Sequence, residues 1–155
     1  MIRSIPLVSI AIALLLLPAP APAASCTLVR VTPLAFGPYS PFGIRSGDWT
    51  GEIVFRCSSI RPEEIVRISL SPGRGAQGWS RRMECPGGAL AYQLYLDRER
   101  TRIWGDGSGG TFDWRSEGPV PPGVDVVVPV YGRVFAGQNV GACTFDDQVE
   151  VTLLY

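Results

Sequence analysis

The sequence predicts a small exported protein with an all-β, disulfide-bonded sandwich. Three observations support this class: strand-like segments alternate between apolar and polar residues, glycine and proline are spread along the chain, and the four cysteines follow a segment typical of secretion. Short segments of this kind, separated by turn residues, are typical of antiparallel β-sandwiches. A length of 155 residues fits one domain plus a targeting segment.

The N-terminal segment has the three parts of a secretory signal peptide. A short basic start precedes an apolar run over residues 5–17, and small residues follow. This pattern predicts a signal peptide over residues 1–23, cleaved after Ala23. The alternative is a membrane anchor, but the apolar run is shorter than the roughly 20 residues that cross a bilayer. We therefore expect an exported domain over residues 24–155 with no stable membrane span.

Alternating or β-branched segments along the mature chain predict short strands. They cover residues 27–36, 52–57, 65–70, 90–97, 124–135 and 148–155. Proline interrupts the first of them at Pro33, and Pro129 predicts a bulge or an edge position in the fifth. Residues 61–68 begin like a helix, but the β-branched alternation that follows favours a strand. We expect no helix and no second domain.

Four cysteines remain in the mature chain: Cys26, Cys57, Cys85 and Cys143. An even number in an exported chain predicts disulfide bonds, and four cysteines allow three pairings. A zinc site is the competing interpretation. It needs closely spaced ligand pairs, whereas these cysteines are far apart and the chain contains no histidine. We expect no metal and no cofactor.

Several residue patterns argue against an enzyme or a nucleic-acid-binding protein. The absence of histidine removes the usual general base and the Ser-His-Asp arrangement. The basic residues are all arginines, interleaved with acids, and the net charge is zero. The paired carboxylates at residues 63–64 and 146–147 are chain neighbours that point to opposite faces of a strand, which does not suit glycoside hydrolysis. The glycine-rich residues 105–110 lack a following helix, so a loop is expected instead of a phosphate site.

The aromatic residues leave one alternative function open. Large aromatic side chains either form a platform for sugar rings or fill the core of a small β domain, and core packing is favoured. The residues concerned are Trp49, Trp79, Trp104, Trp114, Tyr39, Tyr92, Tyr95 and Tyr131. The alternative function is a secreted carbohydrate-binding β-sandwich module.

Short motifs in a fixed order carry a family resemblance over nearly the whole mature chain. They are Cys26, Phe-Gly-Pro-Tyr at 36–39, and residues 52–57, 68–73, 81–83, 90–95, 104–107, 130–134, 136–138 and 147–149. In this order, the chain resembles the spore coat protein U domain, which is shared with archaic chaperone–usher pilins.

The resemblance implies an immunoglobulin-like β-sandwich that lacks its last strand. It also implies a structural subunit of a surface fibre (a chaperone–usher pilus) or of a spore coat, assembled by donor-strand complementation and not an enzyme. The implied partners are a periplasmic pilus chaperone, an outer-membrane usher and neighbouring pilin subunits. The implied location is the periplasm and then the cell surface or the extracellular space.

Two departures from the family pattern concern cysteines. Residues 143–147 replace the common Gly-x-Tyr-x-Asp pattern, and Cys85 is an addition. Since both extra cysteines lie in variable places, we predict the pairs Cys26–Cys57 and Cys85–Cys143.

A sandwich without its last strand has a groove and an unpaired edge, which a donated strand can cover. Alternation within the predicted strands places particular side chains in the core or this groove. The candidates are Phe36, Ile53, Phe55, Ile68, Leu94, Val130, Val149 and Val151.

The predicted cleavage site also suggests a role within a fibre. Cleavage after Ala23 leaves Ala24 and Ser25 before Cys26. Two residues span about 7 Å, whereas strands usually contain five or six residues. We therefore expect a subunit that accepts a donor strand but does not supply one, and that lies at one end of a fibre, at its tip, or in a coat.

Overall fold

The computed structural model describes residues 23–155, so the predicted signal peptide lies outside the described residues except for Ala23. The described residues contain strands and no helix, and hence no helix that could cross a membrane. The strands are β1 (Ser25–Thr32), β2 (Gly47–Ser59), β3 (Arg67–Leu70), β4 (Arg81–Cys85), β5 (Gly88–Tyr95), β6 (Trp114–Arg115), β7 (Asp125–Val134) and β8 (Val151–Leu154).

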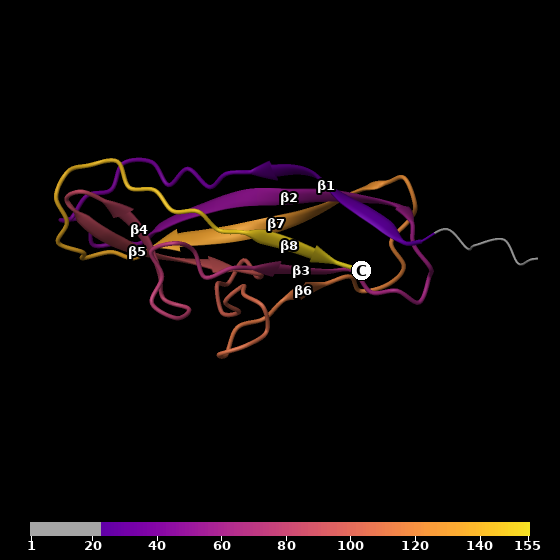
Figure 1. The fold of residues 1–155 in the computed structure, drawn as a ribbon. Helices are drawn as coiled ribbons and strands as arrows, with labels where there is room; N and C mark the ends of the chain where they lie inside the picture. Colours follow the sequence, from indigo (N-terminus) through magenta and orange to yellow (C-terminus); the bar gives the residue numbers. More distant parts are fainter. Residues whose placement is uncertain (1–22) are drawn as a thin grey trace, which may run out of the picture.

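The strands form two antiparallel sheets that face each other. One sheet has the order β1-β2-β7-β5-β4 and the other the order β6-β3-β8. Figure 1 shows the smaller sheet near the C-terminus and the β4–β5 hairpin at the opposite end of the molecule. The predicted all-β sandwich is confirmed.

The core lies between the sheets because apolar side chains alternate inward along the strands. Ile53 and Phe55 of β2 and Ile68 of β3 are almost fully buried. Trp104 is buried completely, and its indole N–H donates a hydrogen bond of 2.9 Å to the Ile68 carbonyl. The Phe55 ring contacts Trp114 edge-on, with a centroid distance of 5.7 Å.

Several predicted strand boundaries were wrong. β1 ends at Thr32, because Pro33 cannot donate to a ladder. β3 begins at Arg67, which leaves Ile65 exposed outside the strand. β8 covers only Val151–Leu154 of the predicted residues 148–155. Sequence inspection missed β4 and β6. The charged residues of β4 hide its alternating pattern in the sequence, although the alternate side chains of Arg81 and Met83 are buried.

Pro129 lies inside β7, which has strands on both sides in the sheet order. On one side β7 pairs with β2 along its whole length, and Pro129 lies opposite Glu52. On the other side β5 reaches only as far as Tyr131. Pro129 is therefore locally at an edge, where a proline is tolerated.

A buried arginine joins the two layers at the β4 side of the sandwich. Arg81 is 1% exposed and donates hydrogen bonds to Gln93 Oε1 (2.5 Å), to the Ser71 carbonyl (2.7 Å) and to the Trp104 carbonyl (2.8 Å). Burial lowers the pKa of its guanidinium to about 10. Because buried charges need several partners, this network fixes β4 to the chain beyond β3.

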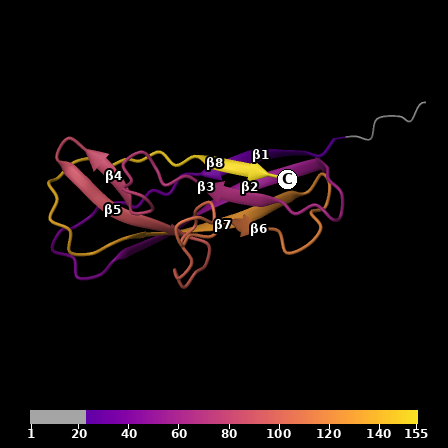
Figure 2. The ribbon, with the colours of Figure 1, turned by 60° about the horizontal axis from the view of Figure 1, so that its bottom comes forward.

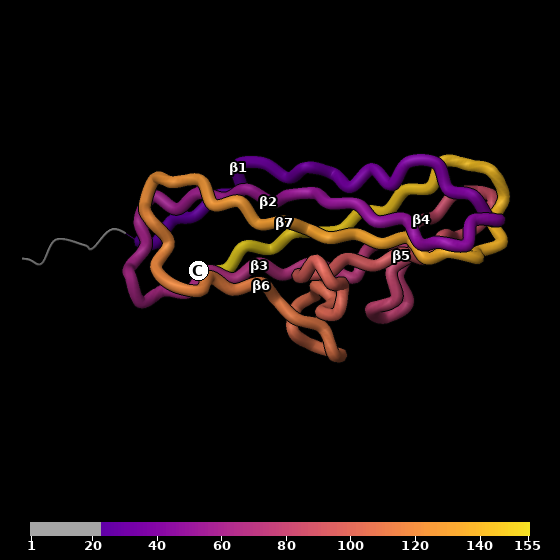
Figure 3. Tube along the Cα trace, turned by 180° about the vertical axis from the view of Figure 1, so that it is seen from behind, coloured from indigo at the N-terminus to yellow at the C-terminus, as the bar shows by residue number. Residues whose placement is uncertain are grey.

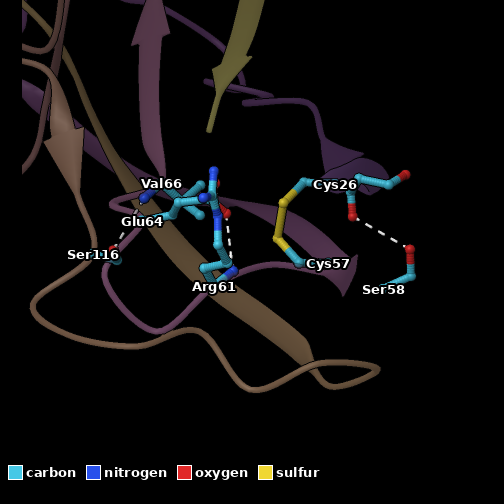
Figure 4. The surroundings of a disulfide bond; sticks show 8 residues. Cys26, Cys57, Ser58, Arg61, Glu64, Val66 and Ser116 are labelled. Carbon is cyan, nitrogen blue, oxygen red and sulfur yellow. Dashed lines mark hydrogen bonds and ion pairs between the residues drawn. A yellow bond between two sulfur atoms is a disulfide. The ribbon is translucent and has the colours of Figure 1, made fainter. Parts of the chain in front are cut away.

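A disulfide bond joins Cys26 of β1 to Cys57 of β2, where the two residues face each other across the ladder (Figure 4). Both cysteines are buried. Next to the bond, the Ser58 hydroxyl donates to the Ser25 carbonyl at 3.4 Å. The bond attaches β1, the edge strand of the larger sheet, to its neighbour.

Candidate functional site

Two strand edges face each other without a strand between them. β1 forms one edge of the larger sheet and β8 one edge of the smaller sheet, and the two strands are close neighbours (Figure 2). In the part of the chain that the structure describes, no strand pairs with the free side of either one. This is the position of the missing strand, so the predicted incomplete immunoglobulin-like sandwich is confirmed.

A groove of about 880 Å³ lies between these edges. Its floor consists of buried side chains that come from both sheets. They are Ile53 of β2, Leu70 of β3, Met83 of β4, Tyr92 and Leu94 of β5, and Val130 of β7. The floor is therefore mostly apolar and belongs to the core itself.

The wall on the β1 side continues past the end of that strand. Val31, Leu34 and Phe36 line it. The Phe36 ring contacts Trp49 edge-on at 5.4 Å and Tyr92 at 5.6 Å, measured between ring centroids. Gly132 of β7 makes this position possible, because a Cβ there would lie 2.8 Å from Phe36 Cε1.

The wall on the β8 side alternates as a strand does. Phe145, Val149 and Val151 line the groove and are half-buried, whereas Gln148 and Glu150, which also border it, are exposed. The exposed residues mark the outer face of this wall. A strand placed beside it would meet apolar side chains on its inner face only.

The groove opens into a second hollow of about 650 Å³ toward the β4–β5 hairpin. The two hollows share Leu34, Phe36, Met83 and Phe145. Figure 3 shows the two chain segments that border the second hollow, residues 35–45 and 140–145, at the end of the molecule away from the C-terminus. Together the hollows extend along the sandwich.

The chain between β7 and β8, residues 135–150, forms much of one wall, and side chains anchor its beginning. The side-chain amide of Gln138 accepts a hydrogen bond from the Ala91 N–H of β5 (2.6 Å) and donates one to the Ala91 carbonyl (2.9 Å). Its backbone N–H donates to the Tyr39 hydroxyl at 2.7 Å. These bonds connect this wall to the segment that forms the opposite one.

Further anchors fix the end of this wall. Asp146 exchanges two backbone hydrogen bonds with Glu84 of β4, at 2.9 and 3.2 Å. The Asp147 carboxylate accepts from the Tyr92 hydroxyl at 2.6 Å and from the Arg74 N–H at 2.7 Å. Gly73 packs directly against this carboxylate, since a Cβ at position 73 would lie 2.2 Å from Asp147 Oδ2, and its φ of 96° also favours glycine. Burial and the bond to Asp147 both raise the pKa of Tyr92.

A second disulfide bond, Cys85–Cys143, joins the end of β4 to the middle of the same wall. Its residues are 58 positions apart in the sequence. The two disulfide bonds join the cysteines that the sequence analysis paired, Cys26 with Cys57 and Cys85 with Cys143.

The predicted groove and core residues fall into two groups. Phe36, Ile53, Leu94, Val130, Val149 and Val151 line the groove. Phe55 and Ile68 are buried outside it. Sequence inspection did not select Leu34, Met83 and Phe145, which also line the groove.

The eight aromatic residues weighed as a sugar platform are all buried or half-buried. Phe36 contacts Trp49 edge-on, and Phe55 contacts Trp114 in the same way. Within residues 23–155 no group of three or more possible metal ligands is present. The site combines an apolar floor with free strand edges, which suits the binding of another strand.

Comparison with known proteins identifies the family. The model of the Spore Coat Protein U domain matches residues 12–152. The chain belongs to this family, as its motifs predicted. A curated relative, Protein U of Myxococcus xanthus, is 32% identical over 133 residues, which cover 79% of this chain and 71% of the relative.

A solved structure shares the fold. It is the complex of the chaperone CsuC with the tip adhesion subunit CsuE, before assembly, from archaic chaperone–usher Csu pili of Acinetobacter baumannii. The matched chain is 19% identical, with a TM-score of 0.59. The alignment covers 86% of this chain but only 40% of the other, so this chain spans about two fifths of its length.

Proposed function

We propose that this protein is an exported structural subunit of a surface fibre or spore coat, and that its groove accepts a β-strand from another protein. The observation that carries the proposal is the apolar groove between the free edges of β1 and β8. Family membership supports the coat or fibre role. The fold shared with a chain from a pilus pre-assembly complex supports a chaperone and pilin subunits as partners.

A strand is expected to bind here because the empty groove leaves backbone hydrogen-bonding groups unpaired and apolar side chains in contact with water. Unpaired N–H and C=O groups on an edge strand promote aggregation, and the adjacent floor of the groove is apolar. A strand inserted between β1 and β8 would pair with both edges and bury alternate side chains in the groove. In the periplasm a chaperone would supply this strand, and at the outer membrane an usher would exchange it for a neighbouring subunit.

The finer role within the fibre rests on the cleavage site. With cleavage after Ala23, only Ala24 and Ser25 would precede Cys26, which is too short for a donor strand. Such a subunit would accept a strand without donating one, as expected at the fibre tip or in a coat that forms without strand exchange. N-terminal sequencing of the secreted protein tests the cleavage site. Fibres formed by the purified chain alone would contradict the acceptor role.

A synthetic donor strand tests the proposal directly. We expect a peptide of about ten residues that alternates valine or isoleucine with threonine to bind the purified mature protein and to raise its melting temperature. A peptide of the same composition in scrambled order is the control. Equal stabilisation by both peptides, or by neither, would refute the proposal. Oligosaccharides tested in parallel should have no effect.

We also propose that the protein has no hydrolase activity. The Tyr92 hydroxyl in the groove is hydrogen-bonded to Asp147, but burial and this bond raise the pKa of Tyr92 and so oppose its ionisation, and Asp147 also accepts from the Arg74 N–H. Turnover of a glycoside or peptide substrate by the pure protein, abolished by a single carboxylate variant, would disprove this.

A further inference from the structure

The two disulfide bonds differ in their access to solvent. Cys26 and Cys57 are 7% and 0% exposed, whereas Cys143 is exposed and Cys85 half-buried. Thiol–disulfide exchange requires a thiolate to reach one sulfur atom of the bond. The Cys85–Cys143 bond is therefore the one that a reductant can reach while the protein stays folded.

The accessible bond lies in a wall of the groove. Cys143 lines the second hollow, and Phe145, two residues further on, lines both hollows. Cys85 is the last residue of β4. Between the anchors at Gln138 and Asp146, this bond is the covalent attachment of the wall to the larger sheet.

The surroundings of the bond favour exchange at one particular sulfur atom. The Gly87 N–H donates a hydrogen bond to Cys85 Sγ at 3.3 Å. Such a bond stabilises a thiolate on Cys85 and makes it the better leaving group. Gly87 also leaves this side of the bond open, because a Cβ there would lie 3.5 Å from Cys143 Sγ and 3.7 Å from Cys85 Sγ.

We propose that Cys85–Cys143 is a thiol-exchange site whose redox state controls how well the groove holds a donated strand. A thiolate of a dithiol reductant attacks Cys143 Sγ, forms a mixed disulfide and releases Cys85 as a thiolate. The second thiol of the reductant then closes its own disulfide and releases Cys143. Two electrons pass to the protein sulfurs, each of which takes up one proton.

The consequence for binding follows from the position of Phe145, and it rests on the proposed function. After reduction, residues 139–145 are held by the hydrogen-bonded anchors next to their two ends and by the packing of Val140 and Phe145 against the core. The inserted strand must then order this part of the wall as it binds, and the cost of ordering reduces affinity. The oxidised subunit is the form that retains its partner; the reduced form releases it more readily.

The experiment treats the folded mature protein with dithiothreitol, blocks free thiols with iodoacetamide, and locates the modified cysteines by mass spectrometry. Binding of the alternating donor peptide is measured by fluorescence polarisation before and after reduction. We expect modification of Cys85 and Cys143 while Cys26 and Cys57 stay paired. We expect the peptide to bind about tenfold more weakly, as ordering one or two further side chains would require.

Two variants serve as controls. Replacement of both cysteines, Cys85→Ser with Cys143→Ser, should bind the peptide like the reduced protein and no longer respond to dithiothreitol. Gly87→Ala should slow the reduction, because its methyl group would lie against both sulfur atoms, without changing the affinity of the oxidised protein. The wild-type measurement remains valid if the double variant does not fold.

The outcomes separate this inference from the proposed function. Reduction of both disulfides at the same rate would overturn the inference, and so would an unchanged affinity after selective reduction; both results leave the strand-accepting groove intact. An oxidised protein that binds no donor peptide overturns the proposed function, and with it the effect on binding proposed here.

Discussion

Asp147 is a residue whose sequence pattern suggests a catalytic carboxylate but whose role in the structure is to hold a loop by hydrogen bonds. As one of two adjacent carboxylates it raised the possibility of acid–base catalysis, but its oxygens accept hydrogen bonds from Tyr92 and from backbone N–H groups of the neighbouring loop. Arg81 is a comparable case, since this charged residue lies outside every predicted strand but is buried in β4. Neither role is visible in the sequence, because both depend on partners supplied by distant segments.

Arg81 gives a first prediction at this scale. Arg81→Leu should lower the free energy of unfolding by about 3 kcal/mol or more, because it leaves the buried Ser71 and Trp104 carbonyls without a donor and removes one of the two donors to Gln93 Oε1. Arg81→Lys should recover only part of the loss, since an ammonium lacks the planar fork of a guanidinium. Urea denaturation measures both. A leucine variant as stable as the wild type would show that the network contributes nothing.

Asp48 gives a second prediction, on the dependence of stability on pH. Hydrogen bonds from Arg133, at 2.7 and 2.8 Å, lower the pKa of this carboxyl group. Its stabilising contribution is therefore complete above the unfolded pKa of about 3.9 and is lost as the pH falls through the lower folded value. Because the pair is partly exposed, the contribution should be below about 1 kcal/mol.

The measurement compares urea denaturation of the wild type and of Asp48→Asn at several pH values. The difference in stability between the two proteins should be largest near neutral pH and should shrink below pH ~4. A difference that stays constant down to pH ~2 would exclude the ion pair as its cause.

At the scale of strands and loops, the sequence predicts which face of a strand points inward wherever apolar and polar residues alternate along it. The segments around Ile53, Leu94 and Val130 were predicted with the correct inward faces, because each strand repeats its pattern over several residues. The groove walls were predicted less well. Leu34 and Phe145 follow a strand end or precede a strand start, and they point inward because of tertiary anchors such as the Glu84–Asp146 hydrogen bonds.

The faces of β8 provide a third prediction. Val151 lines the groove, whereas its neighbour Thr152 is exposed. Val151→Asp should weaken binding of the donor peptide by at least about tenfold, because it places an unpaired charge in an apolar groove. Thr152→Asp, on the opposite face, should change it little. Peptide titration followed by fluorescence polarisation compares them, and equal effects would mean that β8 does not border the binding site.

At the scale of the whole molecule, the directions of the edge strands define how a missing strand would fit. β1 begins near the C-terminal end of the molecule and β8 finishes there (Figure 1). A strand that followed β8 through a tight turn would run antiparallel to β8, alongside β1, over the apolar floor. This geometry provides a fourth prediction.

A chain extended after Tyr155 by a short Gly-rich turn and a strand of alternating valine and threonine should fill its own groove. We expect a monomer with a higher melting temperature than the unmodified protein and no binding of added donor peptide. Calorimetry and light scattering measure these properties. An extension with the same residues in scrambled order is the control, and a similar melting temperature for the two extended chains would contradict the proposed direction and position of the missing strand.

The groove runs along the long axis of the sandwich, and this has a mechanical consequence for a fibre built through it. Tension along such a fibre would pull the inserted strand parallel to its own length. The hydrogen bonds on both sides would then be loaded together in shear, instead of breaking one after another as in peeling. The Cys26–Cys57 bond would pass part of that load from β1 into β2, so that force on the inserted strand would not separate the edge strand from its sheet.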